Sequence, residues 1–297
     1  MAVLEEMQQA VEGVAGASGA SVVAIGERPR GSGVVIGKGR VLTNAHNLRG
    51  EEVHVSFDDG RTETGQVAGA DPDGDLAVIS VETGGAPAVE FAGSPPKLGS
   101  PVFGMARGRD LRVTLGFVSA LGRSFRGPRG RRIQGSVEHT APLARGSSGG
   151  PLVDEAGRLV GINTNRLGDG FYLSIAADDS LRERIDALGR GEGPSRTYLG
   201  VGIAPSHVAR RLRRSVGLPE RDGLLVRAVE EGSPADRAGI QKGDLIVSAS
   251  GSAVSTVDDL YEALDAVSKG DSFELGIVRG AEERKVGVSA GEAKSEV

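Results

Sequence analysis

The residues best suited to chemistry lie in the short glycine-rich stretch Arg145-Gly146-Ser147-Ser148-Gly149-Gly150-Pro151. A serine between glycines can occupy a tight turn, where backbone amides approach a reacting carbonyl without hindrance from a Cβ atom. Ser148 is therefore the candidate nucleophile. Small-residue turns are common, however, and this chain contains 47 glycines. The stretch alone favours a simple surface loop, so the hypothesis depends on a base elsewhere in the chain.

Two further segments supply a base and a carboxylate. His46 follows the apolar run Val41-Leu42-Thr43-Asn44-Ala45, at the end of a predicted strand. Asp75 directly precedes a second apolar run, Leu76-Ala77-Val78-Ile79, at the start of another predicted strand. A histidine can take the proton of a serine hydroxyl, and a carboxylate can hold that histidine in the required tautomer. The three residues form a candidate catalytic triad.

The acidic residues around Asp75 allow a second interpretation. Asp71, Asp73, Asp75 and Glu82 stand at positions 1, 3, 5 and 12 of a calcium-binding loop. Such a loop needs glycine at position 6, where this chain has Leu76 within an apolar run. We therefore expect no metal site here, and no other motif indicates a cofactor.

The composition leaves room for two or three domains in 297 residues. A hydrophobic fraction of 38% and a formal charge of −5 give no indication of bulk affinity for nucleic acid. The absence of cysteine excludes disulfides, thiolate metal sites and cysteine nucleophiles. These totals are compatible with a protein that buries well-formed hydrophobic cores.

The first residues carry no targeting pattern. The longest uncharged run near the start, residues 13–26, is too short and too polar to span a bilayer. Glu5, Glu6 and Glu12 precede the first basic residue, Arg28, which is the reverse of a secretory leader. We therefore expect a cytoplasmic protein, or a periplasmic or extracellular one if the sequence is trimmed.

Local patterns predict the order of the elements. Apolar residues at helical spacing predict a helix over 3–14, which either docks on its own domain or contacts another subunit. Two groups of six short β-rich runs, within 21–81 and 101–175, predict two antiparallel β-barrels and a mainly β protein. A helix over 181–188 closes this part, and the Gly/Pro/Ser-rich segment 189–196 is a predicted linker.

The motifs around the three candidate residues resemble those of chymotrypsin-fold, trypsin-like serine proteases, and are most similar to the Deg/HtrA branch. These motifs are Thr-Asn-Ala-His at His46, Asp-Leu-Ala-Val at Asp75 and Gly-Ser-Ser-Gly-Gly-Pro-Leu at Ser148, in the order typical of the family. The resemblance implies a double-barrel protease domain over 20–188. It also implies that His46 is the base, Asp75 orients it, Ser148 attacks, and the amides of Gly146 and Ser148 hold the oxyanion.

The same resemblance assigns a primary specificity pocket. Its register places Leu143 and the strand Phe171-Tyr172-Leu173-Ser174 in the wall of the pocket, with Leu173 and Ser174 as the named lining residues. An apolar wall without a carboxylate would leave a lysine or arginine of the substrate desolvated and unpaired. We therefore expect cleavage after Val, Ala, Leu or similar side chains.

The segment between Gly122 and Arg132 is rich in arginine, at positions 123, 126, 129, 131 and 132. We expect a solvated loop, because a nucleic-acid patch would bring aromatic platforms and only Phe125 lies here. Its place resembles a loop that helps to set the active site in the family, which suggests a regulatory contact.

A second unit follows the linker. Four segments that begin near residues 198, 223, 232 and 242 resemble a PDZ domain, in the permuted order of Deg/HtrA proteases and over residues 197–290. The resemblance implies a site where an extended chain end pairs with a sheet edge. The expected site residues are Leu199, Gly200, Val201, Gly202 and Ile203 on the edge, with Leu260 and Leu264 on a helix opposite. The tail, 291–297, ends Ser295-Glu296-Val297, which is similar to a PDZ ligand or is simply a frayed end.

These observations predict a serine endopeptidase for protein quality control, which hydrolyses peptide bonds in unfolded or misfolded proteins and binds C-terminal or extended peptides. The alternative is a chaperone or PDZ adaptor whose barrels are proteolytically idle. The family usually forms trimers through aromatic residues near the N-terminus, but the first aromatic residue here is Phe57. The sequence therefore does not support a homo-oligomer of that kind, and within the N-terminal segment 1–19 the helix predicted over 3–14 is the only visible substitute.

Overall fold

The computed structural model describes the chain except for Met1 and residues 28–29, 129–130, 194–196, 268–270 and 293–297. The chain divides into two compact units, Met1–Pro194 and Ser195–Glu296. The predicted PDZ ligand Ser295-Glu296-Val297 lies outside the described residues. Among the helices that the structure describes, none combines the length and the apolar character needed to cross a membrane.

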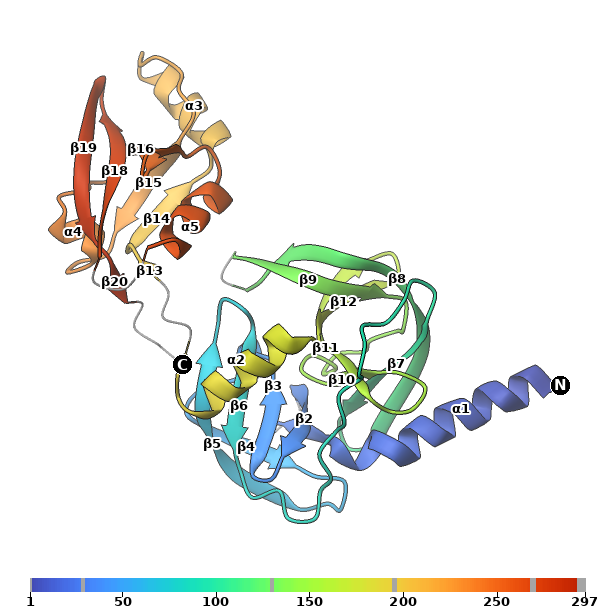
Figure 1. The fold of residues 1–297 in the computed structure, drawn as a ribbon. Coiled ribbons are helices and arrows are strands. Elements are labelled where there is room, and N and C mark those ends of the chain that lie inside the picture. Colours follow the sequence, from blue (N-terminus) through green and yellow to red (C-terminus); the bar gives the residue numbers. More distant parts are fainter. Residues whose placement is uncertain (1, 28–29, 129–130, 194–196, 268–270, 293–297) are drawn as a thin grey trace. The chain divides into compact units, whose positions relative to one another are not determined.

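Six antiparallel strands close the first barrel of the N-terminal unit (Figure 1). Their order around the barrel is β1-β2-β3-β6-β5-β4. Branched aliphatic side chains fill the interior, as expected for strands with one face in a barrel core. The strands are β1 (Val22–Ile25), β2 (Gly31–Gly37), β3 (Arg40–Thr43), β4 (Glu52–Ser56), β5 (Thr62–Asp71) and β6 (Leu76–Ser80).

A second closed barrel follows, in the order β10-β11-β12-β9-β8-β7. Its strands are β7 (Pro101–Arg107), β8 (Leu111–Arg126), β9 (Arg132–His139), β10 (Pro151–Val153), β11 (Leu159–Gly168) and β12 (Phe171–Ala176). The predicted mainly β fold with two six-stranded barrels is confirmed. The two barrels share a hydrophobic cluster, in which Val34 and Leu42 of the first meet Ile162 and Leu173 of the second.

The arginine-rich segment is not the loop that we expected over its whole length. Strands β8 and β9 continue their pairing into it, with Arg123 opposite Ser136 and Phe125 opposite Ile133. Phe125 and Ile133 are buried in the cluster between the barrels. Strand pairing satisfies backbone groups whatever the side chains are, so two buried apolar residues suffice to extend the hairpin. Arg129 lies outside the described residues.

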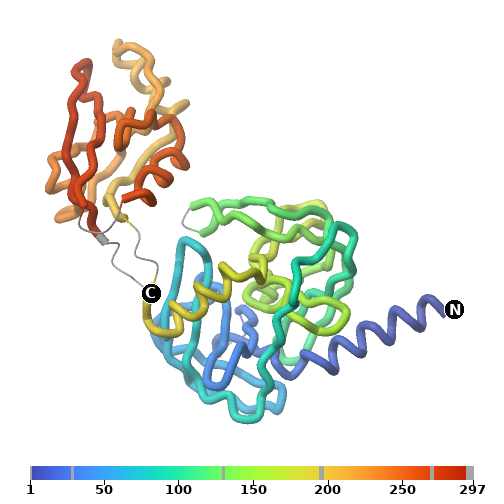
Figure 2. Tube along the Cα trace, in the orientation of Figure 1, coloured from blue at the N-terminus to red at the C-terminus, as the bar shows by residue number. Residues whose placement is uncertain are grey.

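Helix α1 (Ala2–Ser18) is longer than predicted and docks on its own domain through its C-terminal half. Val14 is buried in a cluster with Phe103 and Met105 of β7. At the other end Val3 and Leu4 are exposed by 66% and 72%. The Cα trace shows this end extending away from the barrels (Figure 2). The short helix η1 (Gly19–Ser21) connects α1 to β1.

Helix α2 (Asp179–Gly189) closes the unit across β5 and β6. Asp178 caps its start, where the carboxylate accepts the backbone N–H of Leu181 at 2.9 Å. The buried residues Leu181, Ile185 and Leu188 recur at helical spacing and join the cluster between the barrels.

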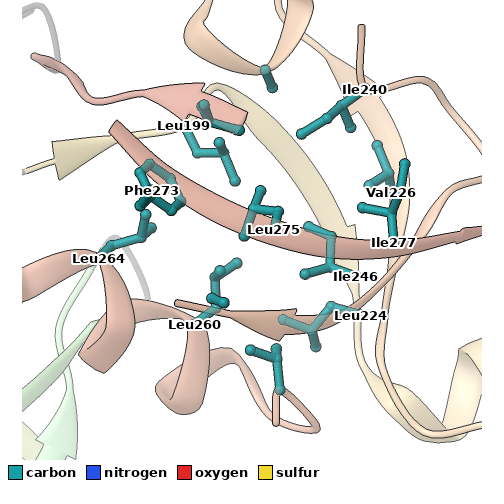
Figure 3. Close-up of a cluster of buried hydrophobic side chains, with 14 of the residues drawn as sticks. Leu199, Leu224, Val226, Ile240, Ile246, Leu260, Leu264, Phe273, Leu275 and Ile277 are labelled. Atoms are coloured by element: carbon teal, nitrogen blue, oxygen red, sulfur yellow. The ribbon is translucent and has the colours of Figure 1, made fainter. Parts of the chain in front are cut away.

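The C-terminal unit consists of a β-sheet and short helices. Its sheet has the order β14-β15-β16-β18-β19, with β17 paired to β16, and a separate ladder joins β13 to β20. The helices are α3 (Ser206–Ser215), α4 (Pro234–Arg237) and α5 (Val257–Asp265). The strands are β13 (Thr197–Tyr198), β14 (Val201–Ala204), β15 (Leu224–Val229), β16 (Leu245–Ala249), β17 (Ser252–Ala253), β18 (Ser272–Arg279), β19 (Glu282–Ser289) and β20 (Gly291–Glu292). Figure 3 shows the core that sheet and helices share, around Leu224, Ile246 and Leu275.

The buried guanidinium of Arg107 ties the N-terminal segment to the barrels. The residue is 6% exposed. Its Nε donates to the carbonyl of Val22 at 2.6 Å and its Nη2 to the carbonyl of Gly19 at 2.9 Å. Nη2 also lies 2.6 Å from a carboxylate oxygen of Asp58.

We expect Arg107→Ala to lower the free energy of unfolding by roughly 2–5 kcal/mol, because the carbonyls of Gly19 and Val22 would each lose a charged donor. Asp58→Asn is the matched control. Asp58 is 54% exposed, and asparagine keeps an oxygen that can accept from Arg107, so this replacement should cost less than that of Arg107. Urea unfolding measures both variants, and equal losses would contradict this account of Arg107.

Candidate active site

The end of β3 and the start of β6 bring His46 and Asp75 together. The two strands are antiparallel neighbours, with Thr43 opposite Ala77. The chain runs from Thr43 into the short helix η2 (Ala45–Asn47), which carries His46, and Asp75 lies two residues before Ala77. This register places both residues at the same end of the ladder. The Nδ1 atom of His46 lies 2.9 Å from each carboxylate oxygen of Asp75.

Asp75 is a carboxylate with hydrogen-bond donors on both oxygens. The residue is 1% exposed and has φ +53°, in the left-handed region. One oxygen accepts the backbone N–H of His46 at 3.2 Å, and the other accepts the hydroxyl of Thr164 at 2.6 Å. Its carbonyl accepts Nδ2 of Asn44 at 2.8 Å. With Nδ1 of His46 directed at the carboxylate, Nε2 is the nitrogen left to act as a base.

Basic side chains engage the other carboxylates of the acidic run. Asp71 pairs with Arg184 of α2 at 3.0 Å, and Asp73 pairs with Arg131 at 3.3 Å. Both cations come from elements outside the turn, so the turn that carries Asp75 is held from two sides. Across the described ranges, no group of three or more His, Asp or Glu side chains is arranged to hold a metal ion.

Ser148 lies in a turn of the second barrel that the first barrel holds in place. Its carbonyl accepts the backbone N–H of Ser32 in β2 at 2.8 Å and Nδ2 of Asn47 at 2.9 Å. Asn47 directly follows His46, so one short helix carries the histidine and anchors the serine turn. Gly149 has φ +83°, and a Cβ atom there would lie 2.2 Å from the carbonyl oxygen of Ser32. The turn therefore requires glycine at this position.

The structure brings His46 and Asp75 into direct contact, but the hydroxyl of Ser148 is hydrogen-bonded to a different residue. The hydroxyl of Ser148 donates to the carbonyl of Thr164 at 3.5 Å. Among the described residues it has no hydrogen bond to His46. Hydrogen bonds of this kind are often long without substrate and shorten when it binds. Thr164 bridges the group, since its carbonyl faces Ser148 and its hydroxyl faces Asp75.

Two backbone amides of the serine turn are available to a ligand. Three of the five amides from 146 to 150 are used within the turn and its neighbours: Ser147 N–H donates to Ala144, Gly149 N–H to Asn163 and Gly150 N–H to Ser147. The amides of Gly146 and Ser148 have no acceptor in the part of the chain that the structure describes. The Gly146 carbonyl is held separately, by the hydroxyl of Ser32 at 2.7 Å.

A pocket of about 440 Å³ opens beside Ser148, and its lining includes only some of the residues predicted for it. Leu143 lines it, together with Tyr172. Leu173 and Ser174 do not: Leu173 is 1% exposed within the cluster between the barrels, and Ser174 is completely buried. Successive side chains of β12 point to opposite faces, so Leu173 faces the core where Tyr172 faces the pocket.

The pocket is also more basic than its apolar prediction. Arg30, Arg145 and Arg166 line it, and the expectation of cleavage after aliphatic residues did not include them. Sequence reasoning also missed the anchoring roles of Asn47 and Thr164. Their neighbours in space lie 101 and 89 positions away in the chain, so no local pattern marks them.

A buried polar chain supports the serine turn from behind. His139 Nε2 lies 3.1 Å from the hydroxyl of Ser174, which donates to Oδ1 of Asn163 at 2.9 Å. The backbone of Asn163 accepts from Gly149 at 2.8 Å and donates to Gly150 at 2.9 Å. Burial lowers the pKa of His139 to about 4, because a charged imidazolium would lose its hydration there. His139 is therefore neutral in the folded protein near pH 7.

In the C-terminal unit, the predicted peptide edge is the outer strand of the sheet. β14 pairs with β15 on one side and ends the described strand order on the other. Val201 and Ile203 are half-buried against the core. Gly200 precedes the strand with φ +78°, and its carbonyl accepts the backbone N–H of Glu230 at 2.9 Å. Gly202 pairs with Ala228 within this ladder.

Three predicted groove residues belong instead to the core of this unit. Leu199, Leu260 and Leu264 are 4%, 2% and 3% exposed and face the same cluster (Figure 3). Leu260 and Leu264 do lie on a helix, α5, but both side chains pack into the core. Val257 and Tyr261 of α5 are half-buried and retain some exposed surface.

Two family descriptions match the chain. Residues 31–162 match the trypsin-like peptidase domain, and residues 198–289 match the PDZ domain.

Among curated proteins, the chain is 33% identical over 282 residues to the putative serine protease HhoB of Synechocystis sp., covering 89% of this chain and 67% of that protein. It is 34% identical over 274 residues to the probable periplasmic serine endoprotease DegP-like of Halomonas elongata, covering 89% and 57%. The chain thus spans about two thirds of the first relative and just over half of the second.

Solved structures share the fold. The serine endoprotease from Yersinia pestis aligns with a TM-score of 0.69 at 24% identity, covering 96% of this chain and 98% of that one. The HtrA-type protease AlgW with tripeptide aligns with a TM-score of 0.63 at 26% identity, covering 95% and 97%.

The expectation of a cytoplasmic protein is wrong. Relatives that are 32–34% identical, from Halomonas, Hahella, Ectopseudomonas and Chlamydia, are named periplasmic serine endoproteases. The expectation rested only on the lack of a leader pattern, and an absence at one end of a sequence does not report the compartment.

We expect Gly149→Ala to lower the free energy of unfolding by roughly 2–4 kcal/mol, because the new Cβ would collide with the Ser32 carbonyl and the residue would hold a left-handed φ. Gly16→Ala is the control: Gly16 lies in α1 with open space around it, and alanine there should stabilise by up to about 1 kcal/mol. Thermal and urea unfolding would distinguish them. A Gly149→Ala variant as stable as the parent would refute the tight approach.

His139 makes stability depend on pH. Its pKa is about 4 when folded and 6.5 in the reference state, so between these values the unfolded chain binds a proton that the folded protein does not. Stability should therefore fall by about 3 kcal/mol as the pH drops from 6.5 to 4. His139→Gln should remove this part of the slope, whereas His54→Gln, at a 39% exposed side chain, should keep it. Urea unfolding across this pH range is the measurement, and an unchanged slope in His139→Gln counts against the assignment.

Proposed function

Because this chain belongs to the Deg/HtrA family of serine endopeptidases, we propose that it cleaves peptide bonds with His46, Asp75 and Ser148 as its catalytic residues. The observation that carries the proposal is the buried contact of Asp75 with Nδ1 of His46, at the barrel boundary where the serine turn is anchored. The protease domain is assigned to 20–188 and the PDZ domain to 197–290, with 189–196 between them.

The geometry supports an acyl-enzyme mechanism. Nε2 of His46 takes the proton of Ser148 as Oγ attacks the carbonyl carbon of the peptide. The amides of Gly146 and Ser148, which lack protein acceptors, donate to the oxyanion that forms. His46 then protonates the leaving amine, and Asp75 stabilises the imidazolium. A water molecule, deprotonated by the same histidine, releases the acyl group and restores Ser148.

The PDZ domain binds C-terminal or extended peptides by adding a strand to the open edge of β14. The backbone from Leu199 to Ile203 supplies the hydrogen bonds, and the half-buried surface of Val257 and Tyr261 faces the bound chain in place of Leu260 and Leu264. A tripeptide named with the related AlgW structure is consistent with peptide ligands.

The substrates are unfolded or misfolded proteins, in a compartment outside the cytoplasm such as the periplasm named for the DegP-like relatives. A homo-oligomer would use the exposed end of α1, where Val3, Leu4 and Met7 lie open to solvent. This contact differs from one made by aromatic residues, which this segment lacks.

The missing hydrogen bond between Ser148 and His46 favours one alternative, a peptide-binding chaperone with idle barrels. Ser148→Ala separates the two. We expect it to reduce turnover of unfolded casein by at least about 10⁴-fold and to abolish labelling by a fluorophosphonate, while peptide binding to the PDZ domain persists.

Ser94→Ala, at an exposed serine away from the turn, should keep both turnover and the label. Mass mapping of the labelled peptide identifies the reacting serine. A parent protein that neither labels nor turns over casein supports the chaperone instead.

A further inference from the structure

Basic side chains gather around the serine turn. A second pocket, of about 320 Å³, adjoins the first, and the two share Leu143, Tyr172 and Arg166. Arg30 and Arg145 line the first pocket, and Arg112 lines the second. Among the described residues, no aspartate or glutamate lines either pocket. Four arginines therefore line these two pockets, and no carboxylate lines them.

These arginines differ from most others in the chain. Elsewhere arginine commonly faces a carboxylate, as in Arg158–Asp154 at 2.8 Å and Arg279–Asp244 at 2.7 Å. In contrast, Arg30, Arg112 and Arg145 have no ion-pair partner in the part of the chain that the structure covers. The chain carries more acidic than basic residues, with a net charge of −5, so a shortage of carboxylates does not explain the unpaired group.

Arg166 is the member that the structure holds in place. It lies on β11 opposite Tyr172, two residues beyond Thr164, whose carbonyl contacts the Ser148 hydroxyl. Its Nη2 atom donates to the carbonyl of Leu143 at 2.6 Å, and the guanidinium lies 5.4 Å from the ring centre of Tyr172. Both partners are neutral. They orient the cation while leaving most of its five N–H donors unused.

From this arrangement we infer that the pocket beside Ser148 selects an acidic side chain of the substrate, at the residue whose carbonyl is attacked, with Arg166 as the specificity-determining residue. The inference rests on the proposed function, because it requires Ser148 to be the nucleophile. Glutamate or aspartate would complete a charge-assisted, bidentate pair with Arg166.

Other side chains fit this pocket less well. Lysine or arginine would meet Arg30, Arg145 and Arg166 without any carboxylate to offset the repulsion. An aliphatic side chain would contact Leu143 and Tyr172 but would displace water from guanidinium groups that gain no partner. The acidic selection therefore replaces the aliphatic one that the sequence suggested.

Four quenched fluorescent peptides that differ only in the residue before the scissile bond, Glu, Gln, Val or Lys, test the inference. Glu and Gln have nearly the same shape, so their ratio isolates the charge. For the full chain we expect kcat/KM for the Glu peptide to exceed that for the Gln peptide by about tenfold or more. The ratio should shrink as salt rises from about 0.05 M to about 0.5 M, because ions screen the pair.

Variants of Arg166 assign the effect to one residue. Arg166→Gln should bring the Glu/Gln ratio close to 1 through loss of Glu turnover, and Arg166→Glu should favour the Lys peptide. Arg211→Gln removes one positive charge from an exposed position on α3 of the other unit and should leave the ratio unchanged. The rate of fluorophosphonate labelling at Ser148 shows that each variant retains its folded serine turn.

The outcomes separate the two levels of the argument. Labelling of Ser148 with equal turnover of the Glu and Gln peptides overturns the acidic selection and leaves the protease intact. A strong Glu preference that survives Arg166→Gln overturns the role of Arg166. Failure of all four peptides, together with an unlabelled Ser148, overturns the proposed function and the inference with it.

Discussion

The active site depends on one buried carboxylate at the boundary between two barrels. A charge in such a place is tolerated only when hydrogen-bond donors surround it. Asp75 obtains its donors from both barrels: the backbone and imidazole of His46 from the first, and the hydroxyl of Thr164 from the second. Any displacement of one barrel against the other would take donors away from the buried carboxylate. The same requirement that makes the site costly to build also fixes its geometry.

The serine turn is likewise held by residues of both barrels. The second barrel carries Ser148, but Ser32 and Asn47 of the first barrel hold its carbonyl. Behind the turn, Asn163 and the buried His139 continue the network on the side of the second barrel. The nucleophile is thus positioned by contacts from both sides, and neither barrel contains a complete site alone. Correct docking of the barrels and assembly of the site are one event.

Charge is distributed unevenly in this protein. The chain as a whole is acidic, and carboxylates pair with arginines over much of its surface. Beside Ser148 the balance is reversed, because four arginines and no acidic residue line the pockets among the described residues. Net charge therefore says little about the potential that a substrate meets, since a concave site amplifies the charges that line it. The charges that line the pocket, rather than the net charge of the chain, determine which substrate side chain it favours.

From the sequence alone, the identity of His46, Asp75 and Ser148 as candidates could be predicted, because each sits in a short motif beside a strand or within a glycine turn. Twelve strands and the long helices could be predicted for a similar reason: period-2 and period-3.6 patterns are local.

Local patterns do not say which way a buried residue faces. That is why Leu173 and Leu264 were assigned to binding sites and proved to be core. Other features bring together residues that are far apart in the chain. They are the pairing of Asp73 with Arg131, the anchoring of the serine turn by Asn47, and the grouping of arginines in the pocket. Only the tertiary structure decided them, because such contacts depend on how the strands close into barrels and on how the two barrels meet.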